Sequence, residues 1–329
     1  MDKTDKLLEI KDLNIQYVTD DGKFKAVNDL HLKIGKGETL GFVGETGAGK
    51  TTTALGIMRL VPNPPGEIVK GDIIFEGENL LEKTEKEMTS IRGNKISMIF
   101  QDPMTSLNPI MTVGEQIEEV IDLHQDIPKN ELRTKAEEML ETVGIRKERF
   151  DDYPHQFSGG MKQRVVIAMA LACNPKLIIA DEPTTALDVT IQAQVLELMK
   201  ELKEKYNTSI LLITHDLGVV AEICDYVAIM YAGTSIEYAD VERLYNNPLH
   251  PYTVGLFNSI PSLDEDVEKL MVIPGTPPNP SDLPTGCRFH PRCSHCMEKC
   301  KKSFPKPVEV EKGHFVSCFL YDKETGEEG

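Results

Sequence analysis

Hydrophobic and polar positions alternate along the first part of the chain in the way that is typical of β-strands. Between residues 8 and 43, LEIKDLNIQY and TLGFVG carry this pattern, and the turn residues DDG separate the predicted strands. From Lys50 the pattern becomes helical, and a group of prolines ends the helix: Pro62, Pro64 and Pro65. GEIVKGDIIFEG and ISMIF follow as two further predicted strands.

The pattern from about residue 103 to 173 predicts helices. Thr112 and Glu115 have the spacing of a capping box ahead of the first of them. A second helix is expected over 131–143, and a third begins at Ser158. This stretch is therefore expected to form a helical subdomain.

Predicted strands and helices alternate in the next part of the chain. KLIIAD, SILLIT and YVAIM read as buried strands, with helices expected over 189–206 and after His215. Alternation of this kind implies a parallel sheet covered by helices. The sequence thus predicts an α/β fold.

The composition changes after His250. Five prolines lie between Pro274 and Pro284, and four cysteines follow within fourteen positions. We therefore expect a first domain over 1–250, which includes the helical subdomain, and a small accessory domain over 251–329 with a proline-rich linker and a cysteine cluster.

The charge and composition of the chain argue against a nucleic-acid-binding protein and against a membrane-spanning one. The formal net charge is −17, from 53 acidic and 36 basic residues, which repels nucleic-acid backbones and argues against a nucleic-acid partner. Within 115–152 the chain has 12 acidic and 6 basic residues, which we interpret as a solvated face in preference to a docking patch. No run approaches the roughly 18 apolar residues that span a bilayer, and the N-terminus has no apolar signal core. The chain is expected in the cytosol, touching a membrane only through a partner.

A phosphate-binding pattern lies between a predicted strand and a predicted helix. GETGAGKT, residues 44–51, matches G-x-x-x-x-G-K-[ST], and its glycines would let backbone N–H groups surround a phosphate at a helix start. Lys50 would reach the β- and γ-phosphates, and the hydroxyl of Thr51 would bind magnesium. The residues predicted to contact ATP here are Gly44, Glu45, Thr46, Gly47, Ala48, Gly49, Lys50, Thr51 and Thr52.

Two carboxylates end the buried strand in KLIIADEP. Acids directly after five apolar residues are costly unless they are paired or bind a metal. Asp181 would hold the magnesium ion, and Glu182 is placed to polarise an attacking water as general base.

Further sequence motifs follow in the order seen in the ATPase subunits of ABC transporters, which the chain resembles over about residues 8–250. Gln101 in IFQDP resembles the glutamine loop, which in that family senses magnesium and faces the transmembrane subunit. Asp188 in TTALD resembles the D-loop, and His215 in LLITHD the switch histidine. The resemblance implies a P-loop NTPase core of the ABC type with a mixed sheet.

FSGGMKQR resembles the signature motif of that family and departs from its commonest form, LSGGQ. The resemblance implies that Ser158, Gly159 and Gly160 cap the γ-phosphate of an ATP held by another subunit, so that two ATP molecules join two ATPases head to tail. Ser158 is also a good helix N-cap, and both interpretations hold together. Tyr17 resembles the aromatic residue that stacks on adenine, and Phe24 is a weaker candidate.

More specific marks resemble the D-type ATPase subunit of dipeptide and oligopeptide importers. They are QDPMTSLNP at 101–109, NPLHPYT at 247–253 and the cysteine tail, and they extend the match to about residue 320. The resemblance implies a second related ATPase or a homodimer, two permease subunits, an external solute-binding protein, and a peripheral location on the cytoplasmic face of the membrane. Relatives with similar marks import nickel or other solutes.

Two other functions remain to be weighed. A soluble mechanical ABC ATPase of translation or DNA repair would be expected to have two ATPase units or a long coiled-coil insert, whereas this sequence has one phosphate loop. A cluster-bearing redox sensor that merely binds ATP would not need hydrolysis.

Seven cysteines in a reducing compartment indicate a metal site more than disulfides. The local spacing is C-x5-C-x2-C-x3-C, which fits neither two zinc knuckles nor a bacterial cluster loop completely. The family resemblance selects four ligands for a [4Fe-4S] cluster, with zinc as the alternative metal: Cys287, Cys293, Cys300 and Cys318. Cys296 is then the extra thiol and the alternative ligand.

Two arginines of the tail and two further cysteines also have expected roles. Arg288 and Arg292 could offset the negative charge of a thiolate-bound cluster, or could be solvated. Cys173 and Cys224 lie in apolar helical runs and are expected in the core.

Overall fold

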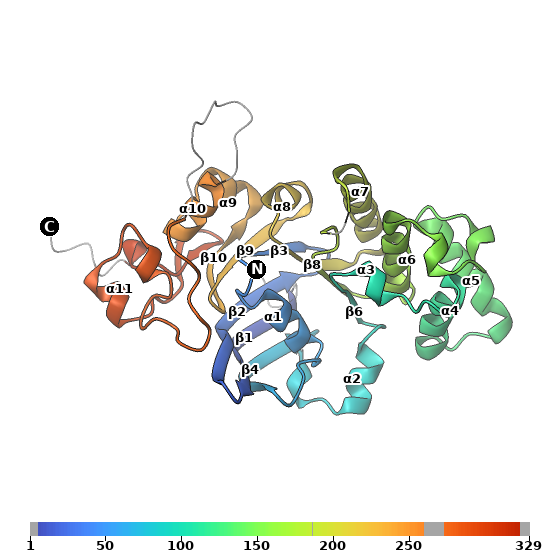
Figure 1. Ribbon diagram of the computed structural model, residues 1–329, viewed down its shortest axis with the longest axis horizontal. Coiled ribbons are helices and arrows are strands. Elements are labelled where there is room, and N and C mark those ends of the chain that lie inside the picture. The colour runs from blue at the N-terminus through green and yellow to red at the C-terminus, as the bar shows by residue number, and fades with distance from the viewer. Residues whose placement is uncertain (1–5, 186, 260–272, 323–329) are drawn as a thin grey trace. The chain divides into compact units, whose positions relative to one another are not determined.

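The computed structural model describes residues 6–185, 187–259 and 273–322 (Figure 1). Its contacts divide the chain into two compact units, and each is described by itself. Unit 1 comprises Met1–Leu7, Ile34–Thr39 and Leu80–Thr214; unit 2 comprises Leu8–Lys33, Leu40–Asn79 and His215–Gly329. In the described ranges every helix is too short or too polar to cross a bilayer.

Unit 2 contains a four-stranded sheet in the order β2-β1-β4-β5 (Figure 1). The strands are β1 (Lys6–Thr19), β2 (Gly22–Gly35), β4 (Gly66–Phe75) and β5 (Glu78–Asn79). β1 and β4 pair antiparallel, with Leu8 opposite Phe75 and Tyr17 opposite Gly66. The alternating pattern of the sequence predicted strands here because each buries one face, but it predicted short ones, whereas β1 and β2 have 14 residues each.

A second set of strands in unit 2 has the order β11-β12-β10-β9-β3. The strands are β3 (Thr39–Val43), β9 (Tyr226–Tyr231), β10 (Thr234–Asp240), β11 (Val308–Glu311) and β12 (His314–Val316). β3 and β9 are parallel, and the pairs beyond β9 are antiparallel. The helices of this unit are α1 (Lys50–Ile57), α8 (Leu217–Ile223), α9 (Val241–Asn246), α10 (Pro251–Asn258) and α11 (Glu298–Lys302).

The C-terminal region joins this set of strands through β12. Glu237 on β10 lies opposite Val316 and is 1% exposed. Its carboxylate accepts the N–H of Leu249 at 2.7 Å and that of His250 at 2.9 Å, and it lies 2.8 Å from Nε2 of His314. One buried carboxylate therefore ties β10, the start of α10 and β12 together, which satisfies a group that would be costly if unpaired. The domain boundary near residue 250 stays a prediction.

His250 is the N-cap of α10, and its Nδ1 accepts the N–H of Tyr252 at 3.0 Å. Burial lowers the pKa of His250 to about 4, although the charge of Glu237 acts to raise it. The imidazole is therefore neutral at pH 7 and keeps its role as an acceptor.

Unit 1 has three parallel strands in the order β8-β7-β6. They are β6 (Ile96–Ile99), β7 (Leu177–Asp181) and β8 (Ser209–Thr214), and the last two are buried along their whole length. Continuous apolar runs are typical of parallel strands covered on both faces. Two helices of unit 1 flank β7 in the sequence: α6 (Gly159–Leu171) precedes it and α7 (Val189–Tyr206) follows it.

A further group of helices in unit 1 lies in the segment that is predicted to form the helical subdomain, whose bounds stay a prediction. These helices are α3 (Pro103–Ser106), α4 (Val113–His124) and α5 (Lys129–Thr142), and α2 (Glu85–Ile91) precedes them. The capping box of Thr112 and Glu115 at α4 is confirmed. A second capping box, of Thr84 and Glu87, starts α2, which the sequence analysis did not predict.

Candidate functional site

The loop between β3 and α1 has the backbone conformation needed to surround a phosphate. Gly47 has φ 80° and Gly49 has φ 99°, a region that side-chain-bearing residues rarely adopt. A Cβ at Gly44 would lie 2.2 Å from the carbonyl oxygen of Met230, and one at Gly49 2.3 Å from that of Ala26. Close backbone packing therefore requires glycine at both positions.

The start of α1 is suited to an anion. Gly49 is its N-cap, so no side chain caps the helix at this position. The N–H groups of the first turn and the helix dipole therefore favour a negative ligand. Thr51 is exposed and Thr52 half-buried, and the N–H of Ala48 donates to the carbonyl of Glu45 at 3.1 Å. The exposed Thr46 and Gly47 form the outer part of the loop.

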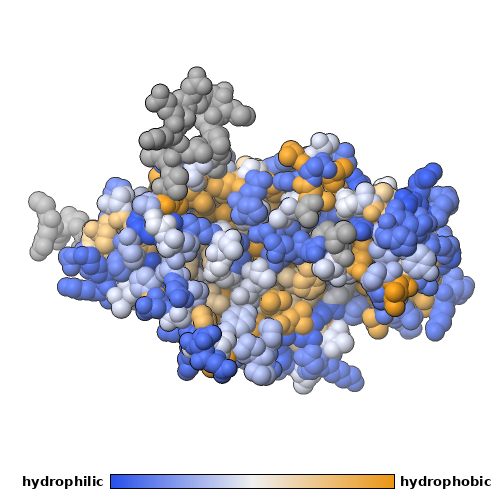
Figure 2. Space-filling view, viewed as in Figure 1, coloured by the Kyte–Doolittle hydropathy of each residue, from blue (hydrophilic) through white to orange (hydrophobic). Residues whose placement is uncertain are grey.

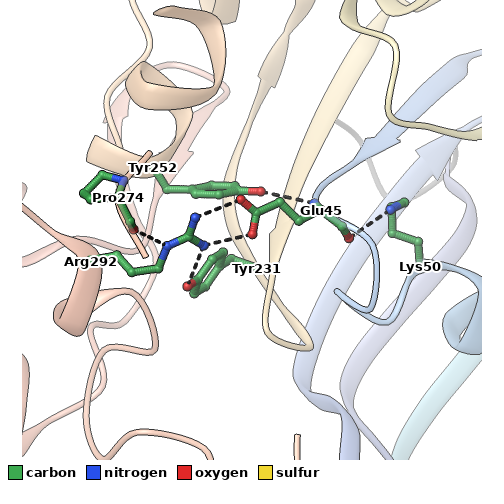
Figure 3. Close-up of polar contacts among 6 residues, drawn as sticks. All are labelled: Glu45, Lys50, Tyr231, Tyr252, Pro274 and Arg292. Atoms are coloured by element: carbon green, nitrogen blue, oxygen red, sulfur yellow. Dashed lines mark hydrogen bonds and ion pairs between the residues drawn. The ribbon is translucent and has the colours of Figure 1, made fainter. Parts of the chain in front are cut away.

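Lys50 is buried at the base of this loop. Its Nζ donates to the carbonyl of Gly44 at 2.7 Å and to that of Glu45 at 3.2 Å. Figure 3 shows the contact with Glu45. A lysine ammonium bonds more strongly to an anion than to a neutral carbonyl. The amino group of Lys50 therefore lies within the loop that is predicted to bind phosphate.

In unit 1 the two acids lie at the end of β7: Asp181 is its last residue and Glu182 follows it. Asp181 is 3% exposed at the strand end, and Glu182 is half-buried with φ 47°. The N–H of Glu182 donates to the carbonyl of Ile213 at 2.8 Å, which fixes this left-handed backbone. Its Oε2 accepts from Nε2 of Gln101 at 2.9 Å and from Oγ1 of Thr185 at 3.0 Å. The structure thus brings together Gln101 and Glu182, two of the three predicted catalytic residues.

The signature segment forms the start of α6. Ser158 is the N-cap, and its Oγ accepts the N–H of Met161 at 3.4 Å. Ser158 and Gly159 are exposed, whereas a Cβ at Gly160 would lie 2.4 Å from Cγ2 of Ile191 on α7. Gly160 is therefore required for the packing of α6 on α7, and the exposed helix start is free of bulky side chains.

The remaining predicted residues lie at strand and helix ends. Asp188 is exposed and caps α7 by accepting the N–H of Ile191 at 3.0 Å. Tyr17 is half-buried near the end of β1, and His215 is exposed directly after β8. Gln101, Asp181, Glu182, Ser158 and Asp188 belong to unit 1; Tyr17, the phosphate loop and His215 belong to unit 2.

Four thiols of the tail line one small cavity in unit 2. They are the four that the sequence analysis selected: Cys287, Cys293, Cys300 and Cys318. Cys296 does not line it. Burial, and then the charges of the other three thiols, raise the pKa of Cys318 to about 11, and burial raises that of Cys287 to about 11.

No three His, Cys, Asp or Glu side chains within the described ranges are arranged to hold a metal ion. The expected metal-binding tail is therefore a cysteine-lined cavity in this structure, and the described residues do not show a metal site. Cys173 and Cys224 are buried, as predicted.

Comparison with known proteins decides the family. A family model described as ABC transporter matches residues 27–185, and one described as Oligopeptide/dipeptide transporter, C-terminal region, matches residues 236–300. The oligopeptide transport ATP-binding protein AppD of Bacillus subtilis (strain 168) is 52% identical over 98% of this chain and 99% of its own length. The chain belongs to this family of ABC transporter ATP-binding proteins.

Further relatives agree with this membership. The oligopeptide transport ATP-binding protein OppD of Escherichia coli (strain K12) is 50% identical over 96% of this chain and 94% of its own length. A solved dimeric structure of the ATP-binding cassette MJ0796 in a post-hydrolysis state, with bound ADP and Pi, covers 71% of this chain and 98% of its own chain. Its TM-score is 0.64 at 28% identity. The chain is thus an ATPase with the ABC cassette fold whose hydrolysis is coupled to transport.

One contact of this ABC ATPase was not foreseen. Arg292 of the cysteine-rich tail forms an ion pair with Glu45 of the phosphate loop, with its Nη1 2.8 Å and its Nη2 3.1 Å from the two carboxylate oxygens (Figure 3). From the sequence, Arg292 is expected either to offset the charge of a cluster or to be solvated, but its side chain is only 6% exposed. The pair spans 247 residues, and no local pattern could indicate it.

Proposed function

We propose that this ABC ATPase hydrolyses magnesium-bound ATP to drive the import of dipeptides and oligopeptides. The observation that carries the proposal is that similarity to oligopeptide transport ATP-binding proteins extends over 98% of the chain and includes the C-terminal region typical of such transporters. ATP-driven uptake of a labelled peptide into vesicles that hold the whole transporter tests it. A soluble mechanical ATPase is not favoured, since neither the relatives nor the C-terminal match point to one.

The phosphate loop would bind ATP through backbone and charge. The N–H groups of the glycine-rich turn would surround the phosphates, and Lys50 would leave the carbonyls of Gly44 and Glu45 for the β- and γ-phosphates. Thr51 and Asp181 would hold a magnesium ion, which would neutralise charge on the phosphate oxygens when bound. Tyr17 would stack on the adenine.

Glu182 would act as the general base for the attacking water. Two donors, Nε2 of Gln101 and Oγ1 of Thr185, hold its carboxylate in one orientation. Gln101 would also contact the magnesium ion, which would connect the cation to the base. His215 would contact the γ-phosphate from the switch position.

The signature helix would act on the ATP of a partner subunit, either a related ATPase or a second copy of this chain. The exposed N-terminus of α6 at Ser158 and Gly159 supports this, because its N–H groups and dipole favour an anion. The dimeric structure of the related cassette MJ0796 is consistent with such an arrangement.

The helical subdomain would contact the permease subunits. Large apolar side chains are exposed in this subdomain at Ile110 (82%) and Leu123 (72%), and just before it at Phe100 (46%), which is next to Gln101. Figure 2 shows scattered hydrophobic residues at the surface of the protein. Contact with a permease would remove such side chains from water. Through the two permeases the chain would be held peripherally at the cytoplasmic face of the membrane, and a solute-binding protein would deliver the peptide.

The cysteine tail would bind a [4Fe-4S] cluster through Cys287, Cys293, Cys300 and Cys318. The shared cavity supports this choice, because four cysteine thiolates are the usual ligands of such a cluster. Zinc, which also takes four thiolates, is the alternative metal. The small accessory domain over 251–329 would be organised around this site.

Serine at Cys318 should abolish metal binding, whereas serine at Cys296 should leave it unchanged. The physical reason is that Cys318 lines the cavity with the other three thiols and Cys296 does not. Iron, sulfide and zinc content of anaerobically purified protein, together with the visible absorption of the cluster, provide the measurement. If Cys318→Ser keeps its iron and Cys296→Ser loses it, Cys296 is the fourth ligand in place of Cys318. If the wild-type protein contains zinc and no iron, the site binds zinc and not a cluster.

A further inference from the structure

Glu45 is held at three points within unit 2. Its carboxylate accepts two hydrogen bonds from Arg292, its N–H donates to the hydroxyl of Tyr252 at 3.1 Å, and its carbonyl accepts from Lys50 (Figure 3). Glu45 directly follows the first glycine of the phosphate loop. The conformation of the loop at this point is therefore determined by contacts from α10 and from the C-terminal tail.

Arg292 is built into the tail as a fixed cation. Its Nε donates to the carbonyl of Pro274 at 2.9 Å and its Nη1 to the hydroxyl of Tyr231 at 3.2 Å. It ends the short helical turn His290–Arg292 and directly precedes Cys293. An arginine guanidinium stays protonated in proteins, and these hydrogen bonds set its orientation before any ligand binds.

The charges of Glu45 and Arg292 give this ion pair a second role besides joining two segments of the chain. A carboxylate in a loop that binds a triphosphate repels the ligand unless a cation neutralises it. The Glu45 side chain is 26% exposed and Arg292 only 6%, so the cation approaches from the protein side and leaves the outer face of the loop open. A bidentate pair also restricts both groups to one geometry, which lowers the entropy lost when the loop closes on phosphate.

We propose that Arg292 is a positioning residue for nucleotide binding: through Glu45 it neutralises and orders the phosphate loop, and so makes the affinity for ATP depend on the folded C-terminal tail. This regulation rests on the proposed role of the loop in binding ATP. Arg292 touches no nucleotide; it acts through Glu45. A change that displaces the segment around Arg292 would therefore weaken ATP binding without altering any residue that contacts ATP.

The test compares nucleotide affinity in full-length variants by titration calorimetry with ATP. Arg292→Gln should weaken ATP binding about tenfold, the size of effect expected for removing one close charge-assisted contact. Arg292→Lys, which keeps the charge but not the bidentate geometry, should lie between this variant and the wild type. Arg292→Gln combined with Glu45→Gln should recover most of the lost affinity, because the uncompensated carboxylate is gone.

A matched control separates loop positioning from general loss of stability. Arg243 in the same unit also pairs with a carboxylate, that of Asp240 at 3.2 Å, and donates to the backbone of Lys312. Arg243→Gln should leave ATP affinity unchanged, and thermal unfolding reports the folded state of every variant.

Wild-type affinity in Arg292→Gln would overturn the proposal, and so would a double variant no better than Arg292→Gln. The role of the loop is tested separately by Lys50→Ala. If that variant binds ATP normally, the proposed nucleotide site fails; if it loses ATP while Arg292→Gln does not, only the positioning role fails.

Discussion

Glu182→Gln should abolish ATP turnover while leaving ATP binding intact. Glutamine cannot accept the proton of the attacking water, and loss of a general base costs on the order of 10²- to 10⁴-fold in rate. Its side-chain oxygen can still accept the hydrogen bonds that Gln101 and Thr185 donate to Glu182, so the local structure should persist. The measurement is the release of phosphate under saturating ATP and magnesium, together with the dissociation constant for ATP.

The same variant should accumulate as a nucleotide-bound dimer. Hydrolysis would normally separate the two ATPases, and its loss leaves both ATP molecules between them. Sedimentation with ATP should show the dimer, and without ATP it should not. Glu201→Gln on the exposed side of α7 is the matched control and should hydrolyse ATP at the wild-type rate. Wild-type turnover in Glu182→Gln would contradict the assignment of the base.

Lys50→Ala should weaken nucleotide binding itself. The variant removes the ammonium that is expected to bind the β- and γ-phosphates, and hydrogen bonds to charged groups contribute about 1.5–3 kcal/mol. We therefore expect ATP affinity to fall by roughly 10- to 100-fold. Titration of the purified protein with ATP provides the measurement.

Lys200→Ala is the control for Lys50→Ala, because it removes an exposed lysine from α7 in the other unit. That variant should bind ATP as tightly as the wild type, because its phosphate loop is unchanged. If Lys50→Ala binds ATP as tightly as the wild type, the loop does not bind the nucleotide through this lysine.

Local sequence patterns predicted much of the fold. The limits of α7 agree with the predicted helix over 189–206, and the box of Thr112 and Glu115 starts α4, because capping and apolar periodicity depend on residues a few positions apart. The glycine spacing of the phosphate loop likewise predicted a strand, a turn with positive φ and a helix start. The chemical roles of the site residues stay predictions.

Contacts between distant segments could not be predicted in this way. β12 has three residues and no clear periodicity, so its pairing with β10 depends on tertiary packing around Glu237. The ion pair of Glu45 and Arg292 joins a common loop motif to an arginine whose neighbours are cysteines. In both cases the signal lies in the folded chain and not in the sequence pattern. The cysteine spacing itself is ambiguous; the family resemblance selected Cys318 over Cys296, and the cavity is lined by the same four cysteines.

The most direct test of ATP-driven peptide import is uptake into membrane vesicles that contain this chain, its companion ATPase and the two permeases, with ATP trapped on the cytoplasmic side. A labelled peptide delivered by the solute-binding protein should accumulate with wild-type protein. It should not accumulate with Glu182→Gln or with a non-hydrolysable ATP analogue. Equal accumulation with Glu182→Gln, or ATP-dependent uptake of nickel in place of peptide, would contradict the proposed function.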